Sequence, residues 1–316
     1  MLRTGEGGRA RPGSVVPVSS PPHPPAPSRP TLRIGVVGAG RVGAVLGAAL
    51  RAAGHEVVAV SAVSQDSVER AELLLPGVPV MPVPEVVEAA QLVLLAVPDD
   101  ALSDLVAGLH ATGTWRPGQL VAHTSGRHGL APFAPAVDLL PMAIHPAMTF
   151  TGTSLDLARL SECCFGITTP QALRPVAEAL VVEMGGEPVW VAEESRGRYH
   201  AALAHGSNHL VTLVAQAMEV LRSAGIEPAD HVLRPLLQAS LDNALSSGDA
   251  ALTGPVARGD AGTVAAHLDE LAGLAEDIRP AYLAQARATA LRAERSGRLR
   301  PDAARSILTA LDEETR

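Results

Sequence analysis

The stretch LRIGVVGAGRVGAVLGAALRAAG, residues 32–54, decides which fold the sequence predicts. A short apolar run precedes three glycines and an alanine- and leucine-rich run follows them, which predicts a buried strand, a tight turn and a helix. Glycines with the spacing G-x-G-x-x-G in this context allow a tight turn, a close approach of backbone to a pyrophosphate and close packing of the helix. The stretch therefore predicts a dinucleotide site, the alternative being a glycine-rich turn without a ligand. The turn residues expected to contact the ligand are Gly38, Gly40, Arg41, Val42 and Gly43.

Strand and helix patterns alternate as far as Glu193, and only helical patterns follow. Such alternation implies βαβ units with right-handed crossovers. We expect an α/β fold, a Rossmann-type doubly wound and mainly parallel sheet, followed by an all-helical C-terminal domain. The strand-like runs after the first are EVVAVS (56–61), QLVLLAVP (91–98), GQLVAHTSG (118–126), CCFGITT (163–169) and EPVWVAE (187–193). The later helices are expected at about 194–225, 228–247, 261–274, 277–295 and 302–313.

The predicted domain organisation has three parts. Residues 1–30 form a disordered tail, because their many prolines and few apolar residues cannot offset the entropy of ordering. Residues 31–160 form the dinucleotide-binding Rossmann domain. Residues 161–316 form the C-terminal domain, in which 161–192 extend the sheet and 193–316 are helical.

Composition limits the classes of function. The 316 residues are 47% hydrophobic but only 2% aromatic, so the core must consist of alanine, valine and leucine. The net charge of −8 and the lack of a basic block argue against binding to nucleic acid. No apolar run reaches the roughly 18 residues of a membrane span.

Cysteine and lysine usage narrows the chemistry further. The only cysteines, Cys163 and Cys164, are adjacent and unsuited to pairing, which favours a reducing, cytoplasmic location. All 25 basic residues are arginine. A Schiff base, a P-loop lysine and a lysine proton donor are therefore excluded.

The end of the second strand indicates which dinucleotide is bound. NAD enzymes usually place Asp or Glu there for the ribose hydroxyls, whereas this chain has Ser61 and, shortly after, Ser64. Arg41 and Arg70 offer charges for a 2′-phosphate, so NADP is favoured. Asp66 keeps NAD possible, although capping the second helix is the simpler role for it.

Other candidates follow from the rule that ligands bind at the carboxyl ends of parallel strands. Val97 and Pro98 end one strand, and Asp99 or Asp100 is expected to cap the next helix. Ser125 is expected near the nicotinamide. His123 falls within its strand, where a packing role and a functional role are equally open.

A helix without charge follows the sheet. The stretch YHAALAHGSNHLVTLVAQAM, residues 199–218, contains no charged residue, which predicts a helix buried on most sides with its polar stripe facing a cavity or the crevice of the sheet. Three interpretations remain open: a hydrogen-bond network, a metal site at His205 and His209, or a proton donor with an orienting amide. Gly206 stands where zincins carry Glu, which weakens the second. The stripe consists of His205, Asn208, His209, Thr212 and Gln216.

Several motifs together resemble one family. They are GAGRVG (38–43), LLAVPDD (94–100), HTSG (123–126), AIHPAMTFTGTS (143–154), YHAALAHGSNHLVTL (199–213) and LTGPVARGD (252–260). From residue 32 to about 295 the chain looks like Rossmann-like oxidoreductases joined to a C-terminal helical domain of unknown function. That family is related to 6-phosphogluconate and β-hydroxyacid dehydrogenases, pyrroline-5-carboxylate reductase and ketopantoate reductase.

This resemblance implies roles for individual residues. Asn208 matches an asparagine that faces the nicotinamide in β-hydroxyacid dehydrogenases, but Ala204 stands where they carry lysine. His205 is the substitute proton donor that we expect, with His209 in reserve. IHPAMTF is similar to a His-Pro segment of prephenate dehydrogenases, which makes His145 either a substrate-side residue or a histidine that packs within a loop. The segment around Arg258 resembles a turn that closes over substrate in pyrroline-5-carboxylate reductases, which implies that Arg258 binds a carboxylate there. Asp260 is expected to be the N-cap of the helix AGTVAAHLDEL, residues 261–271. Relatives imply a homodimer through the helical domain.

The sequence thus supports an NADP-dependent oxidoreductase, with NAD possible, that acts on a small and anionic carbonyl or imine compound. The nicotinamide is expected between Ser125 and the polar stripe. The alternative is a nucleotide-binding sensor or scaffold without turnover, which the missing lysine keeps open. A metal-dependent hydrolase or lyase is the third hypothesis.

Overall fold

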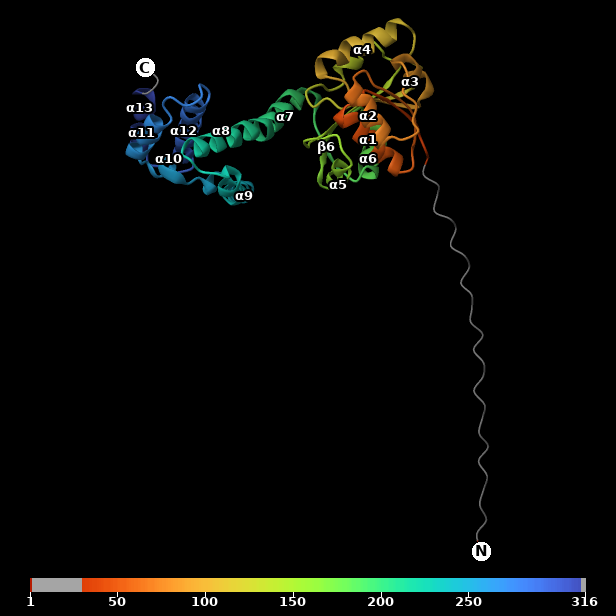
Figure 1. Ribbon diagram of the computed structural model, residues 1–316. Coiled ribbons are helices and arrows are strands. Elements are labelled where there is room, and N and C mark those ends of the chain that lie inside the picture. The colour runs from red at the N-terminus through yellow and green to blue at the C-terminus, as the bar shows by residue number, and fades with distance from the viewer. Residues whose placement is uncertain (2–29, 314–316) are drawn as a thin grey trace. The chain divides into compact units, whose positions relative to one another are not determined.

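The computed structural model describes Met1 and residues 30–313 and consists of two compact units (Figure 1). Met1–Arg196 is the sheet domain, and Gly197–Arg316 is the helical domain. The tail predicted for residues 1–30 lies outside the described residues, apart from Met1 and Pro30.

The described part of the sheet domain contains a seven-stranded sheet with the order β2-β1-β3-β4-β5-β6-β7. All neighbouring strands are parallel except β5 and β6, so the predicted doubly wound and mainly parallel sheet is confirmed. The sheet order changes direction between β1 and β3, which is the switch point where this class of fold binds ligands. The strands are β1 (Arg33–Val37), β2 (Glu56–Ser61), β3 (Leu92–Leu95), β4 (Leu120–His123), β5 (Leu140–Pro146), β6 (Cys164–Thr168) and β7 (Glu187–Trp190).

Helices cover both faces of this sheet (Figure 1). Alternate residues of a strand point to opposite faces, so Ile34 and Val36 of β1 belong to one apolar cluster and Val37 to the other. The first cluster includes residues of α1, α2 and α6, and the second includes residues of α3 and α4. The helices are α1 (Arg41–Ala52), α2 (Gln65–Leu74), α3 (Val83–Ala89), α4 (Asp99–Ala111), α5 (Leu155–Arg159) and α6 (Arg174–Glu183).

Strand β5 and the short helices α3 and α5 of the sheet domain were not predicted from the sequence. Strand β5 contains Pro141 and Pro146, and proline weakens a strand pattern because it cannot donate to the ladder. Helix α3 has only seven residues, too few for a helical period to be recognised. Strand β5 carries the antiparallel β6, and β6 pairs with β7, so the segment 161–192 adds two strands to the sheet.

Helix caps differ from two of the sequence-based expectations. Ser64, not Asp66, caps α2, since its side chain accepts a hydrogen bond from the Ser67 backbone N–H. Neither Asp99 nor Asp100 caps α4, which starts directly after Pro98 with both acids in its first turn. There the carboxylates favour the helix through its dipole instead.

Arg196, which was not a candidate in the sequence analysis, joins the antiparallel strands β5 and β6. Its side chain is buried, with the residue only 1% exposed. Nε donates to Thr168 Oγ1 at 2.7 Å, and Nη2 donates to the carbonyls of Ala143 and Gly166 at 2.9 and 3.0 Å. Arg196 thus ties β5 to β6 where the sheet domain ends.

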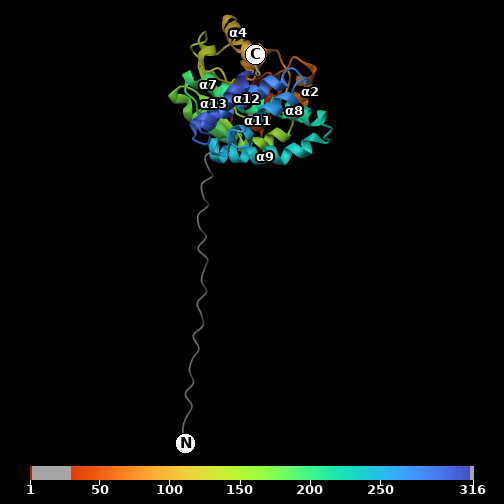
Figure 2. The same ribbon diagram turned by 90° about the vertical axis from the view of Figure 1, so that its left-hand side faces the viewer.

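The helical domain has its own core, with α11, α12 and α13 packed together (Figure 2). Val264, Leu268, Ala290 and Ile307 are fully buried in it. Asp260 caps α11 by accepting from the Thr263 N–H, as predicted. The elements are α7 (Arg196–Leu203), a π-helical segment (Ala204–Asn208), α8 (His209–Ser223), α9 (Ala229–Ser247), α10 (Gly254–Arg258), α11 (Ala261–Glu270), α12 (Ile278–Arg295) and α13 (Pro301–Glu313).

Among the described residues, no helix combines the length and the apolar character that crossing a bilayer requires.

Candidate functional site

The glycine turn, residues 38–43, lies at the switch point of the sheet, between the end of β1 and the start of α1. Gly38 has a φ of +93°, and a Cβ on it would lie 2.6 Å from the Ala96 carbonyl oxygen. A Cβ on Gly43 would lie 2.1 Å from the Gly38 carbonyl oxygen. Both positions therefore require glycine for the turn to form at all.

Gly40 differs from the other two glycines of the turn. A Cβ placed on it would meet no heavy atom within 4 Å among the described residues. The fold itself does not require glycine here, but a ligand that approaches the backbone closely would. The open space at Gly40, next to the N-terminus of α1, fits a dinucleotide pyrophosphate.

Ser61 stabilises this turn from the end of β2. Its Oγ accepts a hydrogen bond from the Gly38 N–H at 3.0 Å, and its carbonyl accepts one from the Ala39 N–H at 2.8 Å. Ser61 is buried, and its hydroxyl oxygen holds the turn; its contact with a ribose stays a prediction. Ser64 is exposed, and its hydroxyl is engaged in the cap of α2.

The remaining cofactor candidates surround the turn. Val97 and Pro98 follow β3, and the side chain of Val97 approaches Gly38. Arg41 is the first residue of α1, next to Val42. Arg70 reaches over from α2, and its Nη1 donates to the Ala39 carbonyl at 3.5 Å. The structure thus brings the predicted residues of the sheet domain together at one edge.

His123 occupies the carboxyl end of β4 and is fully buried. Its Nε2 donates to the Gly129 carbonyl at 2.7 Å, and its Nδ1 accepts from the Ser125 N–H at 3.2 Å. The two partners require the neutral Nε2–H tautomer, because a carbonyl only accepts and an amide N–H only donates. Burial lowers the pKa of His123 to about 4, although the bond to Gly129 opposes this shift. His123 therefore shapes the loop after β4 and is not a proton donor near neutral pH.

Acid is expected to destabilise the sheet domain through His123. The unfolded chain takes up a proton below the ordinary histidine pKa of about 6.5, whereas the folded chain does so only near 4. The contribution of neutral His123 to the free energy of unfolding is therefore fully present above about pH 7. It is lost as the pH falls from about 6.5 to 4, and the loss amounts to up to about 3 kcal/mol. Urea unfolding at a series of pH values measures this. In His123→Gln the free energy of unfolding should depend less steeply on pH over that range. An unchanged pH dependence would contradict the role assigned to His123.

The loop after β4 is held at two further points. Ser125 is buried, and its Oγ accepts from the His128 N–H at 3.1 Å. Both carboxylate oxygens of Glu193 accept from the Leu130 N–H, at 2.9 and 2.8 Å. Ser125 lies at the predicted carboxyl edge of the sheet, and its hydroxyl organises the loop. The sequence analysis did not identify Glu193, because a single acidic residue gives no indication of a partner 63 residues away.

His145 lies in β5, in register with Gly166 of β6, and is partly buried. The sequence analysis expected His145 to lie in a loop, and the structure places it in a strand. Because β4 and β5 are parallel, the carboxyl end of β5 lies at the same edge of the sheet as His123 and Ser125.

The histidine stripe belongs to the helical domain and is interrupted by the π-helical segment 204–208. His205 Nδ1 and His209 Nδ1 lie 2.9 Å apart, so one ring donates to the other. Both histidines and Asn208 are exposed, which corrects the expectation of a helix buried on most sides. A π turn inside an α-helix is often found at a functional site.

Gln216 separates from the rest of the predicted stripe. Its Nε2 donates to the carboxylate of Asp277 at 2.7 Å and to the Asp277 carbonyl at 3.2 Å, and so joins α8 to the start of α12. The prediction of the stripe assumed 100° of rotation per residue, as in a regular α-helix. A π turn rotates by fewer degrees per residue, so residues after it lie on a different side of the helix than predicted. Among the described residues, no group of three or more His, Cys, Asp or Glu side chains is arranged to hold a metal ion.

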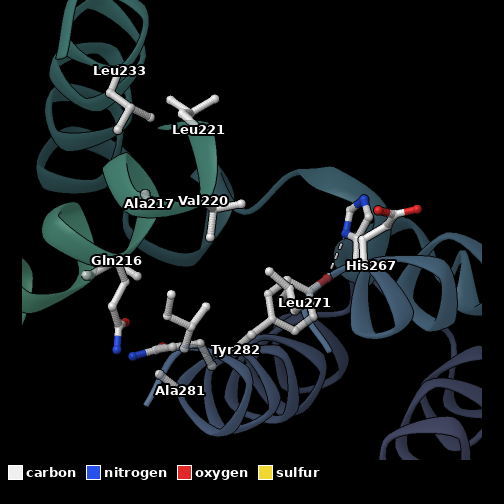
Figure 3. A pocket seen from close by; sticks show the side chains of 13 residues that line it. Gln216, Ala217, Val220, Leu221, Leu233, His267, Leu271, Ala281 and Tyr282 are labelled. Atoms are coloured by element: carbon white, nitrogen blue, oxygen red, sulfur yellow. Dashed lines mark hydrogen bonds between the residues drawn. The ribbon is translucent and has the colours of Figure 1, made fainter. Parts of the chain in front are cut away.

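A cavity of about 460 Å³ opens inside the helical domain, between α8, α9, α11 and α12 (Figure 3). Apolar side chains such as Val220, Leu221 and Leu271 line most of it. His267 Nδ1 and the Tyr282 hydroxyl are hydrogen-bonded at 2.8 Å, and burial raises the pKa of Tyr282. The cavity has few polar groups with which to orient an anionic substrate.

A mainly parallel sheet with a glycine turn at its switch point, followed by a helical domain, defines a Rossmann-like protein. Residues 18–146 match the Rossmann-like domain family, and residues 163–289 match a domain of unknown function, DUF2520. The chain is thus a Rossmann-like protein with a C-terminal DUF2520 domain, which confirms the combination that the sequence motifs predict.

Solved structures with low sequence identity share this fold. A candidate NADP oxidoreductase, BF3122 from Bacteroides fragilis, is 22% identical with a TM-score of 0.70, over 82% of this chain and 98% of that chain. An imine reductase from Pseudomonas sp. is 16% identical with a TM-score of 0.60, over 91% and 100%. A 1-pyrroline-5-carboxylate reductase from Streptococcus pyogenes is 17% identical with a TM-score of 0.53, over 90% and 98%. No curated protein matches the sequence.

Proposed function

We propose that this chain is an oxidoreductase that uses a nicotinamide dinucleotide, with NADP favoured over NAD. The observation that carries the proposal is the glycine turn, in which Gly38 and Gly43 are required by the fold while Gly40 leaves its space open for a ligand. The similar structures are named as an NADP oxidoreductase candidate, an imine reductase and a pyrroline carboxylate reductase. These names support a reductase rather than a nucleotide sensor.

The preference for NADP rests on charge around the turn. The residues that follow β2 are Ala62, Val63 and Ser64, so the acid that usually binds the ribose hydroxyls of NAD is missing. Arg41 and Arg70 approach the same side of the turn and offer two positive charges to a phosphate ester. When bound, the nicotinamide supplies or accepts the hydride.

The proposed substrate is a small and anionic carbonyl or imine compound. Reduction of either group needs a proton as well as a hydride, and we assign the proton donor to the pair His205 and His209, with Asn208 as an orienting amide. Arg258 is exposed at the end of α10 and is the proposed partner of a substrate carboxylate. Ser125 and His145 are proposed as groups of the sheet domain near the reacting atoms.

Cofactor binding and turnover test this proposal together. NADPH and NADH fluorescence titrations of the full chain should give a dissociation constant for NADPH in the micromolar range or below. NADPH oxidation is then followed with a panel of 2-oxo acids, aldehydes and cyclic imines. Binding with turnover of one compound class supports the enzyme. Binding without any turnover favours the sensor, and absence of binding contradicts both.

The helical domain is also proposed to form a homodimer. Helix α9 has 19 residues, of which only Ala229 is buried, and the rest of the helical domain leaves large apolar side chains of α8 and α9 uncovered. Val211 is 69% exposed and Leu245 is 79% exposed. Large apolar side chains left exposed along two helices fit an interaction site, and a second copy of the same helices is the occupant that the resemblance implies.

Sedimentation velocity tests the dimer. The wild-type chain is expected to sediment as a dimer, and Leu236→Glu combined with Leu245→Glu is expected to give a monomer, since charges would be buried in an apolar interface. Leu73→Glu, on the exposed side of α2, is the matched control and should remain dimeric. A wild-type monomer at every concentration would contradict the proposal.

A further inference from the structure

The loop that follows β5 is organised by one buried carboxylate. Asp156 is 0% exposed. Its Oδ2 accepts from the backbone N–H groups of Thr151 and Gly152, at 2.8 and 2.7 Å, and its Oδ1 accepts from the Thr151 hydroxyl at 3.0 Å. Burial alone would raise the pKa of Asp156, but these hydrogen bonds outweigh it and lower the pKa. The carboxylate is therefore charged at neutral pH and fixes the loop.

Gly152 brings this loop into contact with the surroundings of the glycine turn. Gly152 is buried, and its φ is +80°. A Cβ on Gly152 would lie 2.6 Å from Nε of Arg70 and 2.7 Å from Cγ of Arg41. Both arginine side chains thus lie across the one residue of the loop that has no side chain. Arg41 comes from α1 and Arg70 from α2, so three separate segments meet here.

In the described part of the chain, no carboxylate lies within salt-bridge distance of the two arginines. Within residues 30–313, neither Arg41 nor Arg70 forms a salt bridge, and the hydrogen bond of Arg70 is to the Ala39 carbonyl at 3.5 Å. Two arginine side chains that meet at one residue without an acidic partner can both turn toward a bound anion. A phosphate group is one of the anions that guanidinium groups bind through paired hydrogen bonds.

We propose that Gly152, held in place by Asp156, positions Arg41 and Arg70 as the clamp for the 2′-phosphate of NADP and thereby sets the cofactor preference. This inference rests on the proposed function, because it assumes that a nicotinamide dinucleotide binds at the glycine turn. Gly152 and Asp156 are positioning residues that act through the two arginines. An alanine side chain at 152 would displace both arginine side chains, at Nε of Arg70 and Cγ of Arg41, whereas the pyrophosphate contacts at Gly40 would stay.

Dissociation constants for NADPH and NADH, measured on the same variants of the full chain, test the clamp. Gly152→Ala and Arg70→Met are expected to weaken NADPH binding about 10- to 100-fold and NADH binding less than about twofold, as loss of charge-assisted phosphate contacts predicts. Asp156→Asn should change the same ratio in the same direction. Gly77→Ala is the matched control, because Gly77 also has a φ of +80° but a Cβ there would meet nothing within 4 Å among the described residues.

The outcomes separate the clamp from the proposed function. Equal weakening of NADPH and NADH would overturn the clamp and place the arginines at the pyrophosphate instead. Unchanged NADPH binding in Arg70→Met would also overturn it, and this variant keeps the loop intact should Gly152→Ala fail to fold. A wild-type chain that binds NADH and NADPH with equal affinity contradicts the clamp alone. A wild-type chain that binds neither contradicts the proposed function as well.

Discussion

Replacement of Gly43 by alanine is expected to abolish dinucleotide binding, with at least a 100-fold rise in the dissociation constant for NADPH. The added methyl group would lie 2.1 Å from the Gly38 carbonyl oxygen and 2.9 Å from the Ala96 Cβ. Both neighbours are held in place, because the Gly38 N–H donates to Ser61 Oγ and the Ala96 N–H donates to the Val37 carbonyl. The N-terminus of α1 must therefore shift away from β1. That shift removes the backbone N–H groups that would face the pyrophosphate.

The same substitution should also lower the stability of the sheet domain, since overpacking of a closely packed site typically costs about 1–3 kcal/mol. Gly40→Ala separates the two effects. The space around Gly40 is open, so this variant should keep the wild-type unfolding midpoint and lose only affinity. Gly108→Ala, at an exposed position of α4, is the control for both; it should leave NADPH affinity unchanged and raise the free energy of unfolding by up to about 1 kcal/mol. A Gly43→Ala variant that binds NADPH like the wild type would show that the turn is not the cofactor site.

The glycine turn was predictable because its signal is local. Within 23 residues the sequence contains a strand, three glycines at fixed spacing and a helix. The strand and the helix are recognised from the spacing of their apolar residues, and the turn is recognised from its glycines. The same holds for Asp260, where an N-cap is followed at once by its helix. The sequence also indicated that the helical region follows Glu193, since helical periodicity there extends over many turns.

The rest of the candidate site depends on contacts between distant segments. Asp156 and Arg196 are charged residues buried inside the sheet domain, whereas a charged residue in isolation is usually interpreted as surface. Glu193 is exposed, and its partner Leu130 is distant in the sequence. Gly152 is one of many glycines, and its importance arises only because Arg41 and Arg70 converge on it. The π-helical segment also leaves no trace in the sequence, because a periodicity analysis assumes a constant turn per residue.

The histidine pair of the helical domain gives the second large expected effect. In His205→Gln the maximal rate of carbonyl or imine reduction should fall about 100- to 1,000-fold, within the range that general acids contribute, while NADPH affinity stays unchanged. The reason is the 2.9 Å contact between the two Nδ1 atoms, across which one ring can hold a proton for the other. Glutamine keeps the size and hydrogen-bonding capacity of histidine but cannot carry a proton. Stopped-flow single-turnover measurements record the rate.

His209→Gln and the double variant determine how the pair works. If His205 delivers the proton and His209 only holds it, His209→Gln should slow the reaction less, and the double variant should be no slower than His205→Gln, because coupled residues are not additive. His231→Gln, at an exposed histidine of α9, is the control and should keep the wild-type rate. Undiminished turnover in the double variant would exclude both histidines and, since the chain contains no lysine, would leave another group or solvent as the source of the proton.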